Sequence, residues 1–284
     1  MRPIDLNDLP KWSPWPARIL GSTAWLPKTR STEDTGREYN DEKYHRALDY
    51  YLKCGGEKTP EEVNAYEFGR DASEPMCVAR GATLYLTTAA EGFREHYDMV
   101  RDTVVEALGG CQTVVELGCG YGLNLWRLKP HAPGRVLAGG DFADNAVRLA
   151  AGLYRDHPQL SVRHFDFYDE GAYRFLESLT PPLLIFTCGA LELLTETSRV
   201  FHILARYAPA IETVLNFEPV YQLHDDGTQL EMMRRRYIEL NDYNRDFLPE
   251  LQARADVRIS RVTPSVFAVN PLNPISIVQW NFIS

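Results

Sequence analysis

Hydrophobic and polar positions change their period repeatedly between residues 91 and 217. A helical spacing first links Phe93, Tyr97, Val100, Val104 and Leu108, and short apolar runs typical of buried strands follow it. These runs cover residues 113–117, 135–140, 160–165, 183–186 and 213–217, with helical stretches near 122–129, 144–154, 171–179 and 196–208 between them. Strands that alternate with helices form right-handed βαβ units, so the pattern predicts a parallel sheet with helices on both faces.

The pattern changes near the C-terminus. Residues 257–262 and 275–283 are two strand patterns without a helix between them, joined by a linker rich in proline and asparagine at 270–274. Two strands with such a short connection pair antiparallel. We therefore expect an α/β fold with a seven-stranded, mostly parallel sheet that ends in an antiparallel pair.

Two segments lie outside this alternation. Residues 1–30 are rich in proline and tryptophan and are expected to form an irregular arm, followed by helical stretches at 31–53 and 60–68. We expect residues 1–90 to form an arm and a helical cover, and 91–284 to form the main domain. A long insertion follows the fifth strand at 221–251, and we expect it to act as a lid. Substrate contacts expected in the cover and the lid are Tyr39, Tyr221, Tyr237 and Asn241, and core packing is the alternative for each tyrosine.

Composition narrows the classes of partner. The apolar fraction is 44%, which is ordinary for a globular protein, and the formal net charge is −9. Because a protein that binds duplex nucleic acid usually presents a basic face, this charge favours a small neutral or cationic substrate. Five cysteines without a C-x-x-C pair favour the reducing cytoplasm. No apolar run approaches the roughly 18 residues that a membrane span requires. The sequence leaves open whether the protein forms a homodimer.

Chemistry-bearing residues follow the first two strands of the sheet. The first strand ends in Glu116-Leu-Gly118-Cys-Gly120-Tyr-Gly122, and the second ends in Asp141. Only glycine readily adopts the backbone conformations that bring such a loop close to a ligand. An α/β nucleotide fold places a ribose-binding carboxylate roughly 20 residues past its glycines, so Asp141 is a candidate for the two ribose hydroxyls. For Glu116 the alternative is a helix cap.

The spacing E-x-G-x-G-x-G differs from the dinucleotide-binding G-x-G-x-x-G, and with Asp141 it resembles the class I S-adenosylmethionine (SAM) dependent methyltransferase family over residues 91–284. The resemblance extends to Asp141-Phe142 and to His164-Phe165-Asp166-Phe167. It implies SAM as the cofactor, with Asp166 at the adenine amino group and the Phe167 backbone N–H at a ring nitrogen. Pro181-Pro182 stand before the fourth strand, where the family often has an acid.

Methyl transfer requires the acceptor to be held in line and to carry a free lone pair. Glu192 follows the fourth strand and Glu218 ends the fifth, so this pair is expected to bind a cationic amine, amino acid or guanidine for N-methylation. His224, followed by Asp225 and Asp226, is a candidate base for the alternative, O-methylation of a sugar or another hydroxyl. A SAM-binding protein without activity is a further alternative. The sequence contains neither a base-flipping motif for nucleic acid nor a clear set of metal ligands.

Overall fold

The computed structural model describes residues 1–69, 71–225 and 227–283. Within them, the main sheet has seven strands in the order β6-β5-β4-β7-β8-β10-β9. Strands β4 to β8 run parallel, and β10 is antiparallel to both β8 and β9, so the predicted fold class is confirmed. The strands are β4 (Thr113–Leu117), β5 (Val136–Asp141), β6 (Leu160–His164), β7 (Leu183–Cys188), β8 (Ile211–Glu218), β9 (Val257–Phe267) and β10 (Ile275–Phe282).

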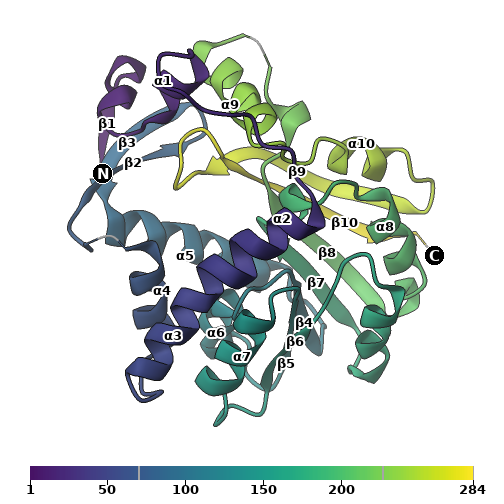
Figure 1. Cartoon of the computed structure of the whole chain (residues 1–284). Helices are drawn as coiled ribbons and strands as arrows, with labels where there is room; N and C mark the ends of the chain where they lie inside the picture. The colour runs from purple at the N-terminus through teal and green to yellow at the C-terminus, as the bar shows by residue number, and fades with distance from the viewer. Residues whose placement is uncertain (70, 226, 284) are drawn as a thin grey trace.

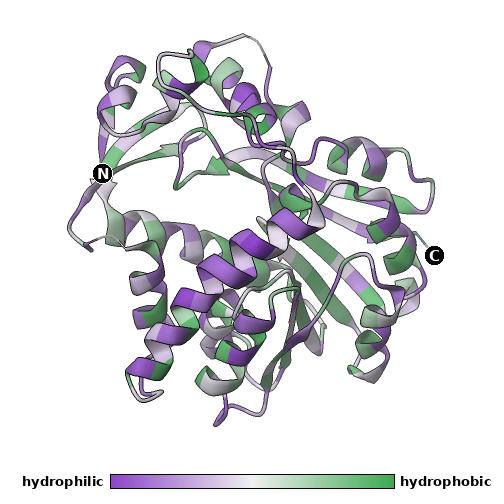
Figure 2. Cartoon of the chain, in the orientation of Figure 1, coloured by the Kyte–Doolittle hydropathy of each residue, from purple (hydrophilic) through white to green (hydrophobic). Residues whose placement is uncertain are grey.

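Helices cover both faces of this sheet (Figure 1). Adjacent residues of β4 point to opposite faces of the sheet: Val114 belongs to the core cluster on one face and Val115 to the cluster on the other. Figure 2 shows the central strands as the most hydrophobic part of the ribbon, as expected for a parallel sheet buried on both sides. The first face carries α5 (Ala89–Ala107), α6 (Leu123–Leu128) and α7 (Asp144–Leu153), and the second carries η4 (Glu170–Ser178), α8 (Ser198–Ala205) and α10 (Phe247–Gln252).

The N-terminal region differs from its prediction as an irregular arm with helices. A second, three-stranded antiparallel sheet has the order β1-β3-β2, from β1 (Arg2–Ile4), β2 (Pro75–Arg80) and β3 (Thr83–Thr88). The turn between β2 and β3 contains Gly81 with φ +55°, a conformation that favours glycine. β1 is too short to show a period and pairs with a strand about 80 residues away in the chain.

The predicted helix at 31–53 is a single helical run that crosses the carboxyl edge of the main sheet beside α7 (Figure 1). It consists of α2 (Thr32–Gly36), a π-helix η2 (Arg37–Tyr44) and α3 (His45–Lys53), and α4 (Pro60–Phe68) packs against α3. The backbone N–H of His45 donates to the carbonyl of Asn40, five residues earlier. The Asn40 side chain accepts from the backbone N–H of Asn145 at 2.9 Å. The run is therefore tied to the start of α7.

The segment after β8 packs on the N-terminal arm. It contains η7 (Tyr221–Leu223), α9 (Gln229–Leu240) and α10, and the arm contains η1 (Leu6–Lys11) and α1 (Trp15–Ile19). The rings of Trp15 and Tyr237 are 4.4 Å apart, and Leu9 and Met233 belong to the same cluster. The remaining short 3-10 helices are η3 (Lys129–His131), η5 (Leu191–Leu193) and η6 (Ala208–Ala210).

Among the helices that the structure describes, none combines the length and apolar character needed to cross a membrane.

Candidate functional site

A cavity of about 350 Å³ lies at the carboxyl ends of β4, β5, β6 and β7, beneath α2 and η2. Its size falls within the usual range for small-molecule sites, and crevices at this edge of an α/β sheet are where such folds bind ligands. Each parallel strand contributes the residues that follow it, and the N-terminal helices form the opposite wall. The lining includes Gly118–Tyr121, Asp141–Ala143, Asp166–Tyr168, Cys188–Ala190, Glu192–Thr195, and Thr32, Thr35, Tyr39, Lys43, Tyr44, Asn64, Glu67, Phe68, His96 and Tyr97.

The loop after β4 requires its glycines. Gly118 and Gly120 have φ values of +75° and +55°. A Cβ atom on Gly118 would overlap the Ala190 side chain, and one on Gly120 would overlap the Tyr44 hydroxyl. The backbone N–H groups of Gly118 and Cys119 donate to the Gly140 carbonyl at 2.8 and 3.1 Å. The loop is thus fixed to β5 and leaves a bare backbone surface toward the cavity.

Asp141 lies half-buried at the end of β5, where the sequence predicts it. Its carboxylate accepts hydrogen bonds from the backbone N–H groups of Gly120 at 2.6 Å and Ala143 at 2.9 Å. Burial raises the pKa of this carboxyl, although these two hydrogen bonds act in the opposite direction. Each oxygen still has a lone pair with which a ligand hydroxyl can bond.

The other predicted cofactor residues gather around the same cavity. Phe142, Asp166 and Phe167 line it beside Asp141, and the Asp166 carboxylate accepts from the Tyr168 backbone N–H at 2.8 Å. Gly122 is outside the lining and precedes the first residue of α6, with φ +82°.

Glu116 lines the cavity from below and is buried. Its Oε1 accepts from the Asn124 side chain at 2.7 Å, and its Oε2 has no hydrogen-bond partner among the described residues. Burial raises the pKa of the Glu116 carboxyl to about 8, and the hydrogen bond from Asn124 only partly offsets this. Glu116 is thus mostly uncharged at neutral pH.

This raised pKa predicts how stability depends on pH. A carboxyl whose pKa rises from 4.5 when unfolded to about 8 when folded stabilises the fold fully at pH below 4.5. This contribution is lost as the pH rises toward 8, because the unfolded chain releases the proton first. We expect Glu116→Gln to remove up to about 1.4 kcal/mol per pH unit of that loss. Denaturant melts between pH 5 and 8 measure the slope, and an unchanged slope in the variant would contradict the assignment.

The two glutamates predicted for catalysis occupy different places. Glu192 lines the cavity, and its Oε2 accepts from the Asn273 side chain at 3.0 Å. Burial, and next the neighbouring carboxyl of Glu218, raise the pKa of Glu192 to about 8. Glu218 is buried behind the lining, where its oxygens accept from the backbone N–H groups of Ala190 and Glu192 at 3.1 and 3.3 Å. The structure thus places Glu218 where it holds the segment after β7.

His224 is not brought to the cavity. Its side chain is fully buried, and Nδ1 lies 2.6 Å from the Glu231 carboxylate of α9. The described carboxylate that orients the ring is therefore Glu231. Asp225 instead accepts from the backbone N–H of Gly227, and Asp226 lies outside the described residues. The prediction missed Glu231 because it comes from the next helix.

Of the four predicted substrate contacts, only Tyr39 lines the cavity. Tyr221 donates to Glu239 at 2.9 Å, and Asn241 donates to the Tyr237 carbonyl at 2.9 Å. Tyr237 itself packs on Trp15. Tyr221 thus bonds to α9, Asn241 bonds to the last turn of α9, and Tyr237 packs α9 against the arm.

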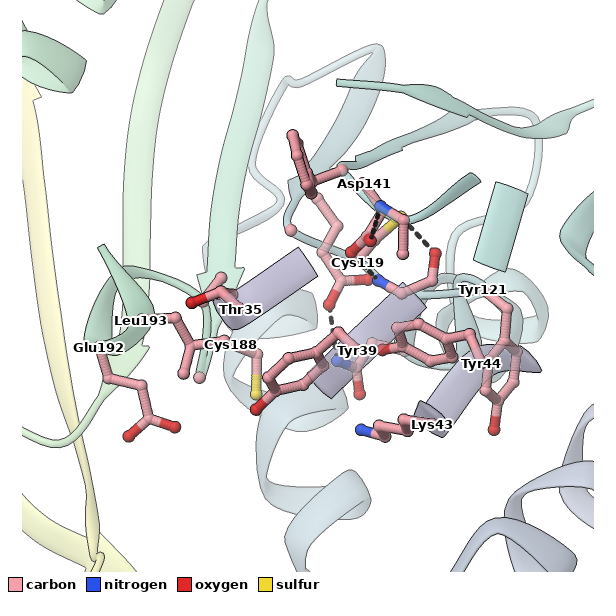
Figure 3. Close-up of a pocket in the computed structure, with 18 of the residues that line it drawn as sticks. Thr35, Tyr39, Lys43, Tyr44, Cys119, Tyr121, Asp141, Cys188, Glu192 and Leu193 are labelled. Carbon is pink, nitrogen blue, oxygen red and sulfur yellow. Dashed lines mark hydrogen bonds between the residues drawn. The ribbon is translucent and has the colours of Figure 1, made fainter. Parts of the chain in front are cut away.

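Many lining residues were not among the predicted site residues, including three that carry a charge or a polar group into the cavity wall. Lys43 and Tyr44 come from η2, and Figure 3 shows them with Tyr39 in the cavity wall. His96 comes from α5; its Nδ1 is buried without a hydrogen-bond partner among the described residues, and burial lowers its pKa to about 4. The helical pattern at 91–108 contained His96, but the pattern alone does not indicate that this face borders a cavity.

The chain matches no family model and no curated protein. Among solved structures it is similar to magnesium protoporphyrin IX methyltransferase from Synechocystis PCC 6803 with bound S-adenosylhomocysteine (SAH), at 17% identity and a TM-score of 0.47 over 68% of this chain and 86% of that one. It is also similar to the N-methyltransferase NodS from Bradyrhizobium japonicum WM9 in complex with SAH, at 13% identity and a TM-score of 0.45 over 67% and 87%. A third similar structure is the bifunctional kinase-methyltransferase WbdD, at 16% identity and a TM-score of 0.40 over 67% of this chain; the chain spans 39% of that protein.

At such identities these structures do not indicate a substrate for this chain. Its own features are more specific: the strand order with β10 antiparallel between β8 and β9, the glycine loop after β4, and the half-buried acid that ends β5. Together they give this chain the class I SAM-dependent methyltransferase fold.

Proposed function

We propose that this chain is a SAM-dependent methyltransferase that acts on the nitrogen of a small amine, amino acid or guanidine. The observation that carries the proposal is that the glycine loop, Asp141 and the buried carboxyl of Glu192 face one cavity. A cofactor and a cationic acceptor can therefore meet there, shielded from water.

The cavity residues fit SAM. The bare backbone of Gly118 and Gly120 leaves room that a Cβ would fill, Asp141 offers two acceptor oxygens for the ribose, and Asp166 and the Phe167 backbone offer an acceptor and a donor for adenine. When bound, SAM supplies a methyl group on a positively charged sulfur. The protein then has to align the acceptor and remove its proton.

Glu192 suits that second task. The carboxyl groups among the described lining residues are those of Glu67, Glu116, Asp141, Asp166 and Glu192, and the basic side chains are those of Lys43 and of His96, whose imidazole burial keeps neutral. Such a cavity favours a cation. With its pKa near 8, Glu192 is ionised in a minor fraction of molecules at neutral pH, and this fraction grows as the pH rises. The ionised carboxylate can pair with an ammonium group and accept its proton, because general bases work best close to the operating pH. The amine then carries the lone pair that attacks the methyl group.

O-methylation of a sugar or another hydroxyl is the second candidate, and one observation favours it. His96 lines the cavity with an imidazole that burial keeps neutral and whose Nδ1 is without a partner among the described residues. A neutral imidazole can accept a hydroxyl proton. This role was assigned to His224 on sequence grounds, and His96 now takes its place.

Location and partners follow from the same reasoning. The net charge of −9 supports a small acceptor rather than nucleic acid. All five cysteines are free thiols, which supports the cytoplasm as the site of action.

The deciding experiment is methyl transfer from radiolabelled SAM to a panel of amines and a panel of alcohols, with the product characterised by mass spectrometry. Transfer to amines supports the proposal, and transfer confined to alcohols supports the alternative. SAM binding without transfer to either panel would instead support a non-catalytic SAM-binding protein.

Asp141 provides a test of the cofactor site. We expect Asp141→Ala to weaken SAH binding by about 1.5–3 kcal/mol, since hydrogen bonds to a charged group have this value. Asp141→Asn, which retains one acceptor oxygen, should lose less. Titration calorimetry gives both affinities, and equal affinity in wild type and both variants would remove Asp141 from the cofactor site.

A further inference from the structure

The cavity contains one pair of opposite charges. Among the described lining residues, Lys43 is the only lysine or arginine, and its Nζ lies 3.0 Å from Oε1 of Glu67. Lys43 comes from η2 and Glu67 from α4, so the pair belongs to the N-terminal helices and not to the loops of the sheet.

The Lys43–Glu67 pair is held in place, but both side chains can form further hydrogen bonds. The Glu67 side chain is 8% exposed, and its Oε2 is buried without a hydrogen-bond partner among the described residues. The Lys43 ammonium lies 5.1 Å from the ring centres of both Tyr39 and Tyr44, a distance typical of cation–π contacts. An ammonium has three donors, and one ion pair leaves Lys43 with capacity for a second anion.

SAM carries a chemical group that matches such a pair. Its amino-acid head has an ammonium and a carboxylate on the same carbon, so its binding site needs both charges side by side. Among the described lining residues, Lys43 and Glu67 provide a positive and a negative charge side by side. We propose that Lys43 and Glu67 together bind the amino-acid head of SAM, with Lys43 donating to its carboxylate and Oε2 of Glu67 accepting from its ammonium.

This inference rests on the proposed function and extends it to residues outside the glycine loop. Glu116 and Asn124 are the competing site for the ammonium, because Glu116 Oε2 and Asn124 Oδ1 also have no partner among the described residues. The described partner of Glu116 is the Asn124 amide, whereas Lys43 pairs with Glu67, and the buried Glu116 carboxyl is mostly uncharged at neutral pH. Glu116 and Asn124 can therefore accept hydrogen bonds from the SAM ammonium, but they offer no positive charge for the SAM carboxylate.

Calorimetry with two probes tests the proposal. SAH contains the amino-acid head, whereas 5′-methylthioadenosine shares the adenosine and the thioether but lacks the head. In Lys43→Met and Glu67→Gln we expect SAH affinity to fall at least tenfold and 5′-methylthioadenosine affinity to stay within twofold of wild type. Lys43→Arg should retain most of the SAH affinity. Lys53→Met, an exposed lysine on α3 of the same helical run, should change neither, and thermal melts verify that each variant is folded.

Two results would overturn the inference while leaving the cofactor assignment intact. One is an SAH to 5′-methylthioadenosine affinity ratio that Lys43→Met leaves at the wild-type value, which would place the carboxylate on backbone N–H groups. The other is a ratio that collapses in Glu116→Gln and not in Glu67→Gln. If wild type binds neither probe, the proposed function itself fails.

Discussion

Gly118→Val is expected to abolish SAM binding, with a loss of at least a hundredfold in affinity. A valine there must adopt a positive φ that β-branched residues rarely take. Its Cβ would also overlap Ala190 and crowd Phe167, so the loop would have to leave the position in which it faces the cofactor. Calorimetry with SAH measures the loss.

Gly134→Val is the matched control. Gly134 has the same φ of +75°, but no atom lies within 4 Å of its added Cβ. This variant has the same backbone strain, of order 1–3 kcal/mol, without blocking the cavity. We expect it to lose stability and retain SAH binding. If both variants bind SAH like wild type, the glycine loop is not the cofactor site.

Glu192→Gln is expected to reduce turnover at least tenfold, a loss of about 1.4 kcal/mol or more in the transition state, while SAM affinity is unchanged. The amide cannot take the proton from the acceptor. The wild-type rate should rise with pH through the pKa of Glu192 near 8, since only the ionised carboxylate is a base. The rate of the variant should not show this rise. Single-turnover rates from pH 6 to 9 measure both effects.

His96→Ala and His224→Ala complete this test. If the acceptor is an amine, both variants should keep most of their single-turnover rate. If it is a hydroxyl, His96→Ala should be the damaging change and Glu192→Gln should stay active. Full activity in Glu192→Gln and His96→Ala would place the proton acceptor elsewhere in the cavity. His224 is fully buried against Glu231, so we expect its replacement to affect stability rather than turnover.

The parts of the site on the main sheet could be predicted from sequence because they are local. A buried parallel strand appears as a continuous apolar run, and the residue after its last apolar position lies at the ligand edge. Asp141 ends β5 and Asp166 follows β6, as this rule expects. Glu116 is the last but one residue of β4 and Glu192 comes four residues after β7, and all four acids line one cavity.

The parts that come from other elements could not be predicted in this way. Tyr237 and Asn241 were expected at the cavity because they follow β8 in the chain, yet α9 packs toward Trp15 of the arm. Lys43 lines the cavity from a helix that Asn40 ties to α7, 105 residues away in sequence. No period or spacing within residues 31–53 records a contact of that range.

The π-helix at Arg37–Tyr44 has a consequence for how this segment can evolve. Each of its hydrogen bonds spans five residues instead of four, so the segment contains more residues than an α-helix would need to cover the same distance. A wide turn of this kind absorbs an extra residue that a regular α-helix could accommodate only by rotating everything beyond it by about 100°. Thr35 precedes the π-helix and Lys43 lies near its end, and both line the cavity. This segment can therefore lose one residue at the wide turn during evolution while both of its ends keep facing the site.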